Sequence, residues 1–304
     1  MIHGLLKRLA LRPPALRDTR SGHGVALSAP AITALLVWSL VPLGMTLWFS
    51  FQRYNLMEPG RTGFDGFGNY RYLLSDPGIG LAIWNTVLLL GSVLVVTIGA
   101  GTLLAVLFDQ EFFGRGVARV LVLTPFFVMP TVSALLWKNM MLHPDNGFVA
   151  FLMRCVGLRP IDWFAVMPLT SIIVIVSWQW LPFAFLTLLT AVQSLDEERK
   201  EAARMDGAGP IAMFRFIIWP HLGRAVAATV MIETIFLLGI FAEIYVTTAG
   251  GPGFASTNLS FLIYRYVLME YDIGGASVAG LLAIVLANVL AFFLMRSFAR
   301  NLDT

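Results

Sequence analysis

Long apolar runs without charged residues constrain this chain more than any other feature. A membrane-spanning helix needs roughly 20 mostly apolar residues, and six segments qualify: about 26–51, 82–108, 117–138, 168–194, 224–248 and 274–296. With 58% hydrophobic and 13% charged residues, the chain has more apolar surface than one soluble core can bury. The surplus must face lipid. We therefore predict an all-α polytopic membrane protein with six transmembrane helices within residues 26–298.

The positions of lysine and arginine predict the orientation of these helices. If the N-terminal tail and alternate loops are cytoplasmic, fourteen of the 21 basic residues lie on that side and seven on the other. This asymmetry follows the positive-inside rule, so both termini, 1–25 and 299–304, are predicted to be cytoplasmic tails. The basic residues form short clusters between apolar runs, which indicates membrane orientation rather than nucleic-acid binding despite a net charge of +3.

Few residues are suited to metal or redox chemistry. Cys155 is the single cysteine, which excludes an internal disulfide, and the four histidines show no metal-ligand spacing. The sequence shows no glycine-rich nucleotide loop, Ser/His/Asp arrangement or acidic metal cluster. We therefore expect no metal site and no cofactor on this chain, and any enzymatic engine would be another subunit.

The loop between the fourth and fifth predicted spans, 194–222, has the pattern of a helix-turn-helix. Ser194 and Glu197 have capping-box spacing, and the residues that follow are mostly good helix formers. Gly207 and Gly209 would supply a left-handed stop to the first helix.

The second short helix of this loop is delimited by prolines. Pro210 suits its first position, and we expect Pro220 to end it before the next span. In the first helix, Ala202 and Ala203 leave a flat face between charged neighbours that a partner protein can approach. The alternative is a charged, solvated loop without a partner.

The loop resembles a motif of a known family. Its string Glu201-Ala202-Ala203-x-x-Asp206-Gly207-Ala208, followed by Phe214, Ile217, Pro220 and Leu222, is similar to the EAA loop of bacterial binding-protein-dependent ABC importer permeases. Trp219, where leucine is usual, and Arg224, where a second proline is common, depart from that pattern. The resemblance implies the type I ABC importer permease fold. It assigns coupling to an ATPase to Glu201, Ala202, Ala203, Asp206 and Gly207.

The same resemblance implies a set of partners. A second homologous permease would complete a heterodimer, two ATPase subunits would bind ATP and Mg²⁺, and an extracytoplasmic solute-binding protein would deliver the substrate. The chain would lie in the bacterial inner membrane among lipids, would be no enzyme itself, and would work by alternating access.

Four further segments resemble sorbitol and mannitol permeases most: 125–134, 162–164, 193–198 and 274–277. The implied substrate is therefore a polyol, with maltose, trehalose or glycerol phosphate as alternatives. A different class, an ion-coupled secondary transporter, would use Glu233 and Glu243 and leave the loop motif unexplained. A membrane-embedded enzyme or a scaffold without a pathway are the remaining alternatives.

A polyol site needs amide or carboxyl partners for hydroxyl groups together with aromatic faces. The predicted pathway is lined by Phe127, Thr131, Gln179, Trp180, Phe183, Glu233 and Leu237. A charge near mid-membrane is costly unless it faces water or a partner, which favours a pathway position for Glu233, as does its match to a sugar-facing position in maltose-type permeases. The alternatives are core or lipid packing for the aromatic residues and a structural hydrogen bond for Gln179 or Glu233.

Overall fold

The computed structural model describes residues 20–299, in two units that are treated separately. The predicted tails, 1–25 and 299–304, lie largely outside this range, so their location stays a prediction. The first unit is helix α1 (Arg20–Ser50) as far as Trp48. Its side chains are exposed from Ser28 to Met45, as expected for an apolar helix that contacts lipid.

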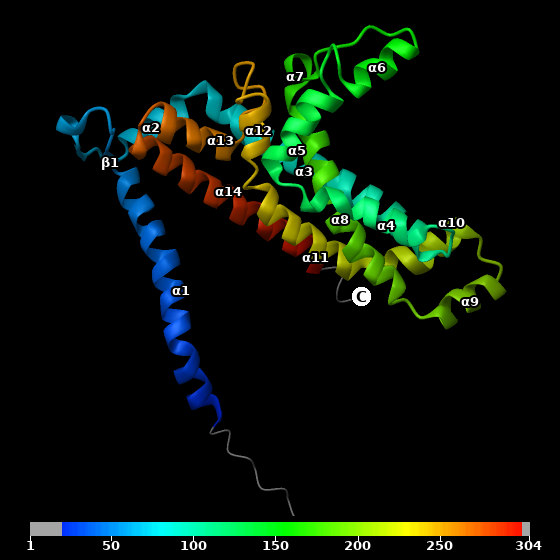
Figure 1. Ribbon diagram of the computed structural model, residues 1–304. Coiled ribbons are helices and arrows are strands. Elements are labelled where there is room, and N and C mark those ends of the chain that lie inside the picture. Colours follow the sequence, from blue (N-terminus) through cyan, green and yellow to red (C-terminus); the bar gives the residue numbers. More distant parts are fainter. Residues whose placement is uncertain (1–19, 300–304) are drawn as a thin grey trace, which may run out of the picture. The chain divides into compact units, whose positions relative to one another are not determined.

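The second unit, from Phe49 onward, is dominated by helices (Figure 1). Two short strands, β1 (Gln52–Arg53) and β2 (Gly63–Phe64), pair in antiparallel register. The α-helices are α2 (Gly68–Ser75), α3 (Pro77–Asp109), α4 (Arg115–Leu123), α5 (Pro130–Leu136), α6 (Phe148–Cys155), α7 (Trp163–Val166), α8 (Pro168–Gln193), α9 (Glu197–Met205), α10 (Pro210–Met213), α11 (Trp219–Leu237), α12 (Ala242–Thr247), α13 (Leu259–Tyr264) and α14 (Ile273–Ala299). Single turns of 3₁₀-helix are η1 (Pro59–Arg61) and η2 (Thr124–Phe127), and π-helical turns are η3 (Trp137–Met141), η4 (Phe214–Ile218) and η5 (Arg265–Met269).

Helix α3 is the longest helix of the second unit and packs along α8. It starts where the Asp76 side chain accepts a hydrogen bond from the N–H of Gly78 at 2.7 Å. Its 33 residues give a length of about 50 Å, more than the ~30 Å hydrocarbon layer of a bilayer. Gly101 lets the two backbones come close, because a Cβ built there would lie 3.0 Å from the Cβ of Ala184 on α8.

The third predicted span, 117–138, is not one helix, and that expectation was wrong. Two helical pieces, Arg115–Phe127 and Pro130–Met141, meet at a bend of 107°. Pro130 has no N–H to continue the helical ladder. Val128, two residues before it, is extended, with φ −80° and ψ 129°. The bend frees backbone carbonyls that need partners elsewhere in the chain.

The fifth predicted span, 224–248, is also broken, so the expectation of one helix there was wrong. Helix α11 ends at Leu237 and α12 starts at Ala242, with Phe241 between them at φ −144° and ψ −49°. The freed carbonyls are satisfied from the chain leading into α13. Asn258 donates to the Ile240 carbonyl at 2.6 Å, and Ser260 donates to the Leu238 carbonyl at 2.7 Å.

Four continuous helices among the described residues are long and apolar enough to cross a membrane. They are Ser28–Ser50, Pro77–Asp109, Pro168–Gln193 and Ile273–Leu294, and the bent pair raises the number to five if it is counted as one span. They coincide with the first, second, fourth and sixth predicted spans. The all-α class is confirmed, whereas the count of six and the topology stay predictions.

The close approach of α3 and α8 predicts opposite results for two glycines two residues apart. Gly101→Leu forces a side chain into the α8 backbone, and overpacking of this kind costs about 1–3 kcal/mol. At Gly99 a Cβ meets nothing within 4 Å, so Gly99→Leu gains helix propensity without a clash. Thermal unfolding of the detergent-solubilised protein should show a lower Tm for Gly101→Leu only. Equal Tm values for the two variants would contradict the packing described.

Candidate functional site

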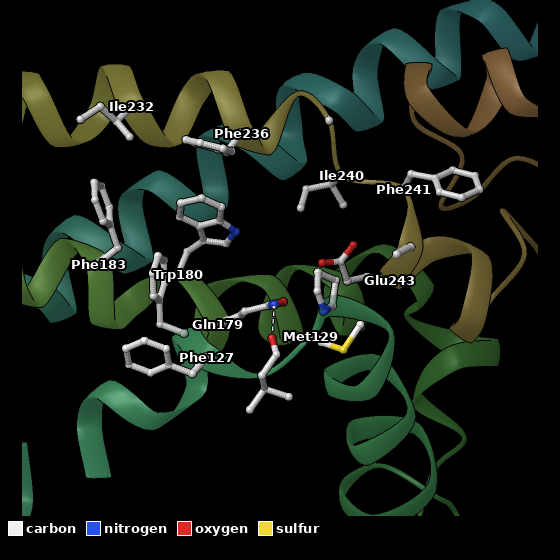
Figure 2. A pocket seen from close by; sticks show the side chains of 15 residues that line it. Phe127, Met129, Gln179, Trp180, Phe183, Ile232, Phe236, Ile240, Phe241 and Glu243 are labelled. Atoms are coloured by element: carbon white, nitrogen blue, oxygen red, sulfur yellow. Dashed lines mark hydrogen bonds between the residues drawn. The ribbon is translucent and has the colours of Figure 1, made fainter. Parts of the chain in front are cut away.

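A pocket of about 690 Å³ opens where the two helix breaks face each other across α8 (Figure 2). One wall comes from η2 and the start of α5, the second from the middle of α8, and the third from α11, the break after it and α12. The lining residues are Phe126, Phe127, Val128, Met129, Pro130, Gln179, Trp180, Phe183, Ile232, Phe236, Gly239, Ile240, Phe241, Ala242 and Glu243.

The bend before α5 is held against α8 by Gln179. The side-chain amide of Gln179 donates to the freed carbonyl of Val128 at 3.0 Å, as Figure 2 shows. Its Oε1 has no hydrogen-bond partner among the described residues, so the same amide retains one acceptor beside the pocket. Gln179 therefore closes the bend, and its buried Oε1 stays an unpartnered acceptor next to the pocket.

Six of the fifteen lining residues are aromatic. The rings of Phe126 and Phe183 stack with centroids 6.1 Å apart, and Trp180 lies 5.2 Å from Phe236 across the pocket. Phe127 is 81% exposed at the mouth. Such faces pack well on the C–H surfaces of a ligand and leave its polar groups to a few hydrogen-bonding side chains.

Among the described residues that line the pocket, Glu243 is the only acidic one. It lies in the first turn of α12, directly after the break, and is 2% exposed. In Figure 2 its carboxyl group points toward the space between Gln179 and Ile240. A carboxyl group and an amide thus lie on opposite walls of an otherwise apolar pocket.

The pocket brings together four of the predicted pathway residues, Phe127, Gln179, Trp180 and Phe183. Thr131 lies exposed in the first turn of α5, outside the lining. Their role in transport stays a prediction, because the arrangement of residues alone does not test it.

Glu233 and Leu237 lie elsewhere in this conformation. Glu233 is fully buried and accepts a hydrogen bond from the Thr97 hydroxyl of α3 at 2.7 Å, while its Oε1 has no partner among the described residues. Leu237 is 1% exposed in the core. The pocket-facing positions of α11 are Ile232 and Phe236, four residues apart on one helix face, and Glu233 lies about 100° away from Ile232. A pathway role for Glu233 and Leu237 remains a prediction, since neither residue lines the pocket in this conformation.

Sequence reasoning missed the second half of the lining. The predicted pathway includes none of Phe126, Phe236 and Phe241, and the sequence analysis names Glu243 only for the ion-coupled alternative. The signal that was available is Gly239, a glycine inside an apolar helical run, which favours a break and therefore a change of face.

The predicted coupling loop is an exposed helical hairpin, formed by α9 and by α10 with its continuation into α11. The capping-box expectation was wrong. Asp196 caps α9 by accepting from the N–H of Glu198 at 3.2 Å, whereas the Ser194 hydroxyl donates back to the Ala191 carbonyl of α8 at 2.8 Å. Asp196 is two residues closer to the first helical turn than Ser194 and offers a carboxylate to the helix N-terminus.

Gly207 ends α9 as expected. It has φ +81°, and the N–H of Ala208 after it returns to the Ala203 carbonyl at 2.9 Å, the bond of a Schellman motif. The left-handed conformation expected at Gly209 was wrong, since its φ is −72°. Pro210 starts the second helix as predicted, but Pro220 does not end it, because the helical path continues through the π-helical turn η4 and Pro220 into α11.

The residues assigned to coupling form one accessible surface. Glu201, Ala202, Asp206 and Gly207 are exposed and Ala203 is half-buried. Met205 beside them is 88% exposed. The surface therefore exposes charged helix side chains next to small residues.

Comparison with known proteins places the chain in a family. Residues 97–304 match the family described as "Binding-protein-dependent transport system inner membrane component". The "Probable ABC transporter permease protein y4oQ" of Sinorhizobium fredii is 32% identical over 260 residues, which cover 85% of this chain and 84% of that protein. The "Trehalose/maltose transport system permease protein MalF" of Thermococcus litoralis is 30% identical over 293 residues, which cover 94% and 96%.

The fold agrees with a solved structure. A chain of a bacterial alginate ABC transporter, in complex with an alginate pentasaccharide-bound periplasmic protein, superposes with a TM-score of 0.77. The match covers 92% of this chain and 95% of that chain at 24% sequence identity. With a family match over more than half of the chain and relatives of 30% identity along most of it, this protein belongs to the inner-membrane components of binding-protein-dependent transport systems.

Proposed function

We propose that this chain is one permease subunit of an ATP-driven importer, and that the pocket forms part of the route of a neutral carbohydrate, a polyol or a related sugar. The observation that carries the substrate class is the lining itself, in which five phenylalanines and Trp180 surround Gln179 and Glu243. Hydroxyl groups would bond to the amide and the carboxyl group while the C–H faces of the ligand pack on the rings.

The absence of cationic side chains from the described lining supports a neutral substrate. No lysine or arginine lines the pocket, and its one titratable residue is the acidic Glu243. A phosphate or a uronic acid would therefore meet no counter-ion here. The Brucella suis relative named as an sn-glycerol-3-phosphate permease and the alginate transporter show that the wider group is not restricted to neutral cargo.

Support for a polyol within this class is narrower. Residues 125–134, one of the four segments that resemble sorbitol and mannitol permeases, contribute Phe126 to Pro130 to the pocket. The named trehalose/maltose permease of Thermococcus litoralis favours a disaccharide instead. The volume of about 690 Å³ lies within the range typical of small-molecule sites and admits either ligand.

In this proposal α9 is the part that contacts the ATPase. Two ATPase subunits would bind ATP and Mg²⁺, a second permease would complete the pathway, and a solute-binding protein would deliver cargo from outside. ATP-dependent closure of the ATPases moves α9, and alternating access follows because that movement favours one of two packings of the spans.

A pair of proline substitutions tests the coupling surface. Gly207→Pro cannot keep φ at +81°, so α9 loses its terminating turn, whereas Gly209→Pro fits the observed φ of −72°. In cells that carry the complete system, uptake of radiolabelled mannitol, sorbitol and maltose should fall to background for Gly207→Pro and stay above about half for Gly209→Pro. Normal uptake by Gly207→Pro, or uptake that persists without the ATPase, would favour a gradient-driven transporter.

Substitution of the two buried acids tests which one meets the substrate. Glu243→Gln keeps the size of the side chain but replaces a charge-assisted hydrogen bond by a neutral one, so KM for the preferred polyol should rise about two- to tenfold. Glu233→Gln, buried against Thr97, should leave KM unchanged. The exposed Glu58→Gln serves as a control.

The reverse pattern would overturn the pocket assignment. If Glu233→Gln changes KM or the ranking among mannitol, sorbitol and maltose while Glu243→Gln does not, then the pathway follows the residues predicted from the sequence and the pocket has another role.

A further inference from the structure

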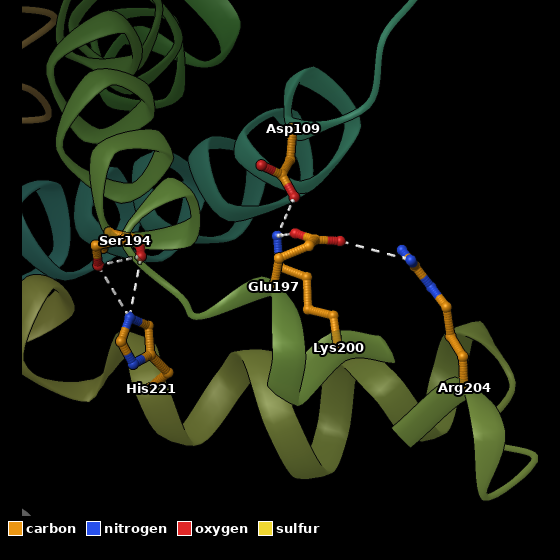
Figure 3. Close-up of polar contacts among 7 residues, drawn as sticks. Asp109, Ser194, Glu197, Lys200, Arg204 and His221 are labelled. Carbon is orange, nitrogen blue, oxygen red and sulfur yellow. Dashed lines mark hydrogen bonds and ion pairs between the residues drawn. The ribbon is translucent and has the colours of Figure 1, made fainter. Parts of the chain in front are cut away.

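Helix α9 has an inner face as well as the exposed one, and that inner face is built around Lys200. The Lys200 side chain is 8% exposed, and its Nζ lies 2.9 Å from Oδ2 of Asp109 and 3.1 Å from Oε2 of Glu197 (Figure 3). Glu197 also lies 3.5 Å from Arg204, which is largely exposed. The Lys200–Asp109 pair joins α9 to α3, because Asp109 is the last residue of α3.

The charges of this pair depend on each other. Burial alone would lower the pKa of Lys200, but hydrogen bonds to Asp109 and Glu197 and their negative charges outweigh it and hold the pKa above its usual value. Lys200 is therefore a cation throughout the physiological range. Removing Lys200 would leave the Asp109 carboxylate without this cation, and removing Asp109 would leave the poorly solvated Lys200 with Glu197 alone, whereas removing both leaves neither charge.

Only three residues connect α8 to α9, and a histidine of α11 contacts the end of α8. Residues 194–196 join the two helices, with Leu195 buried among them. His221 of α11 lies 3.1 Å from both the Ser194 hydroxyl and the Ala191 carbonyl at the end of α8 (Figure 3). Helix α9 thus meets α8 through the chain and α3 through Lys200.

From Asp109 the contacts continue along α3 to the pocket wall. The ring of Phe108 meets Phe185 of α8 edge-on with centroids 5.1 Å apart, and Gly101 lies against Ala184. Phe183, Trp180 and Gln179, which line the pocket, precede these two residues on the same helix. Close packing of this kind transmits displacement because it has little room to deform.

We propose that Lys200 is a positioning residue that makes α3 and α8 move together with α9, so that movement of the ATPase reaches the pocket. The proposal rests on the function proposed above. Without the Lys200–Asp109 contact, α9 can pivot on the three-residue connection while α3 stays in place, and ATP is hydrolysed without productive rearrangement of the pocket.

The test uses the complete importer in proteoliposomes, with substrate-loaded binding protein outside and ATP inside. Substrate uptake and ATP hydrolysis are measured together for Lys200→Met, Asp109→Asn, the double variant and Lys200→Arg. We expect both single variants to lose about tenfold or more in substrate moved per ATP. Lys200→Arg should keep most of the coupling, because the guanidinium can still pair with Asp109. Arg61→Met, which removes an exposed ion pair with Glu58 far from α9 in the sequence, should change the ratio less than twofold.

The double variant separates transmission from folding. Lys200→Met/Asp109→Asn leaves no unpaired buried charge, so its Tm should recover toward the native value while the substrate moved per ATP stays low. Recovery of that ratio together with Tm would reduce Lys200 to a structural role and overturn the proposal, as would a native ratio in Lys200→Met. A failure of the proposed function itself would be distinct, since the native complex would then show no ATP-dependent uptake.

Discussion

Backbone carbonyls freed at two helix breaks are the constraint on which the rest of the site depends. At membrane depth no water is available to satisfy them, so each break exists only where other parts of the chain supply donors. Gln179 serves the bend at Val128, and Asn258 and Ser260 serve the break after Leu237. The pocket is a consequence of this arrangement. Where the helices stop being regular, side chains of three elements converge, and one of the donors is itself part of the lining.

The pocket and the exposed helix α9 are linked through the packing of α3 on α8. Gly101 allows a close approach that a larger residue would prevent, and Phe108 packs on Phe185 near the end of α3. The same α3 ends at Asp109, which pairs with Lys200 of the exposed helix α9. A closely packed pair of helices with the pocket on one part and the ion-paired, exposed helix α9 at its end is suited to carrying movement between them.

Much of the fold was predictable because long apolar runs leave a chain few alternatives, and α8 was predicted to within one residue (168–194 against Pro168–Gln193). The breaks were not predicted, although Pro130 and Gly239 lie at them. A proline or glycine in an apolar run is compatible with a continuous helix, as Pro182 within α8 shows. Whether the helix breaks depends on donors such as Asn258 that are distant in sequence.

The candidate site was predictable where its residues lie on one continuous helix. Gln179, Trp180 and Phe183 share one unbroken helix whose pocket-facing side follows from their spacing. Glu243 follows a break that changes which face of the segment is turned inward, so helical periodicity counted from Arg224 fails there. The coupling surface was predicted from family resemblance alone, because no physical rule distinguishes an exposed helix that binds an ATPase from one that is only solvated.

Accessibility of neighbouring positions on α11 tests the central claim, that this pocket holds the substrate, most directly. In a Cys155→Ser background, Phe236→Cys places a thiol in the lining, and Ile235→Cys places one on a neighbouring face, where Ile235 is 70% exposed but outside the pocket. The complete complex is trapped with vanadate while binding protein is docked, and the rate of maleimide labelling is compared between substrate-loaded and substrate-free binding protein. The account predicts that substrate slows labelling at 236 and leaves 235 unchanged. Equal rates at 236 with and without substrate would contradict it.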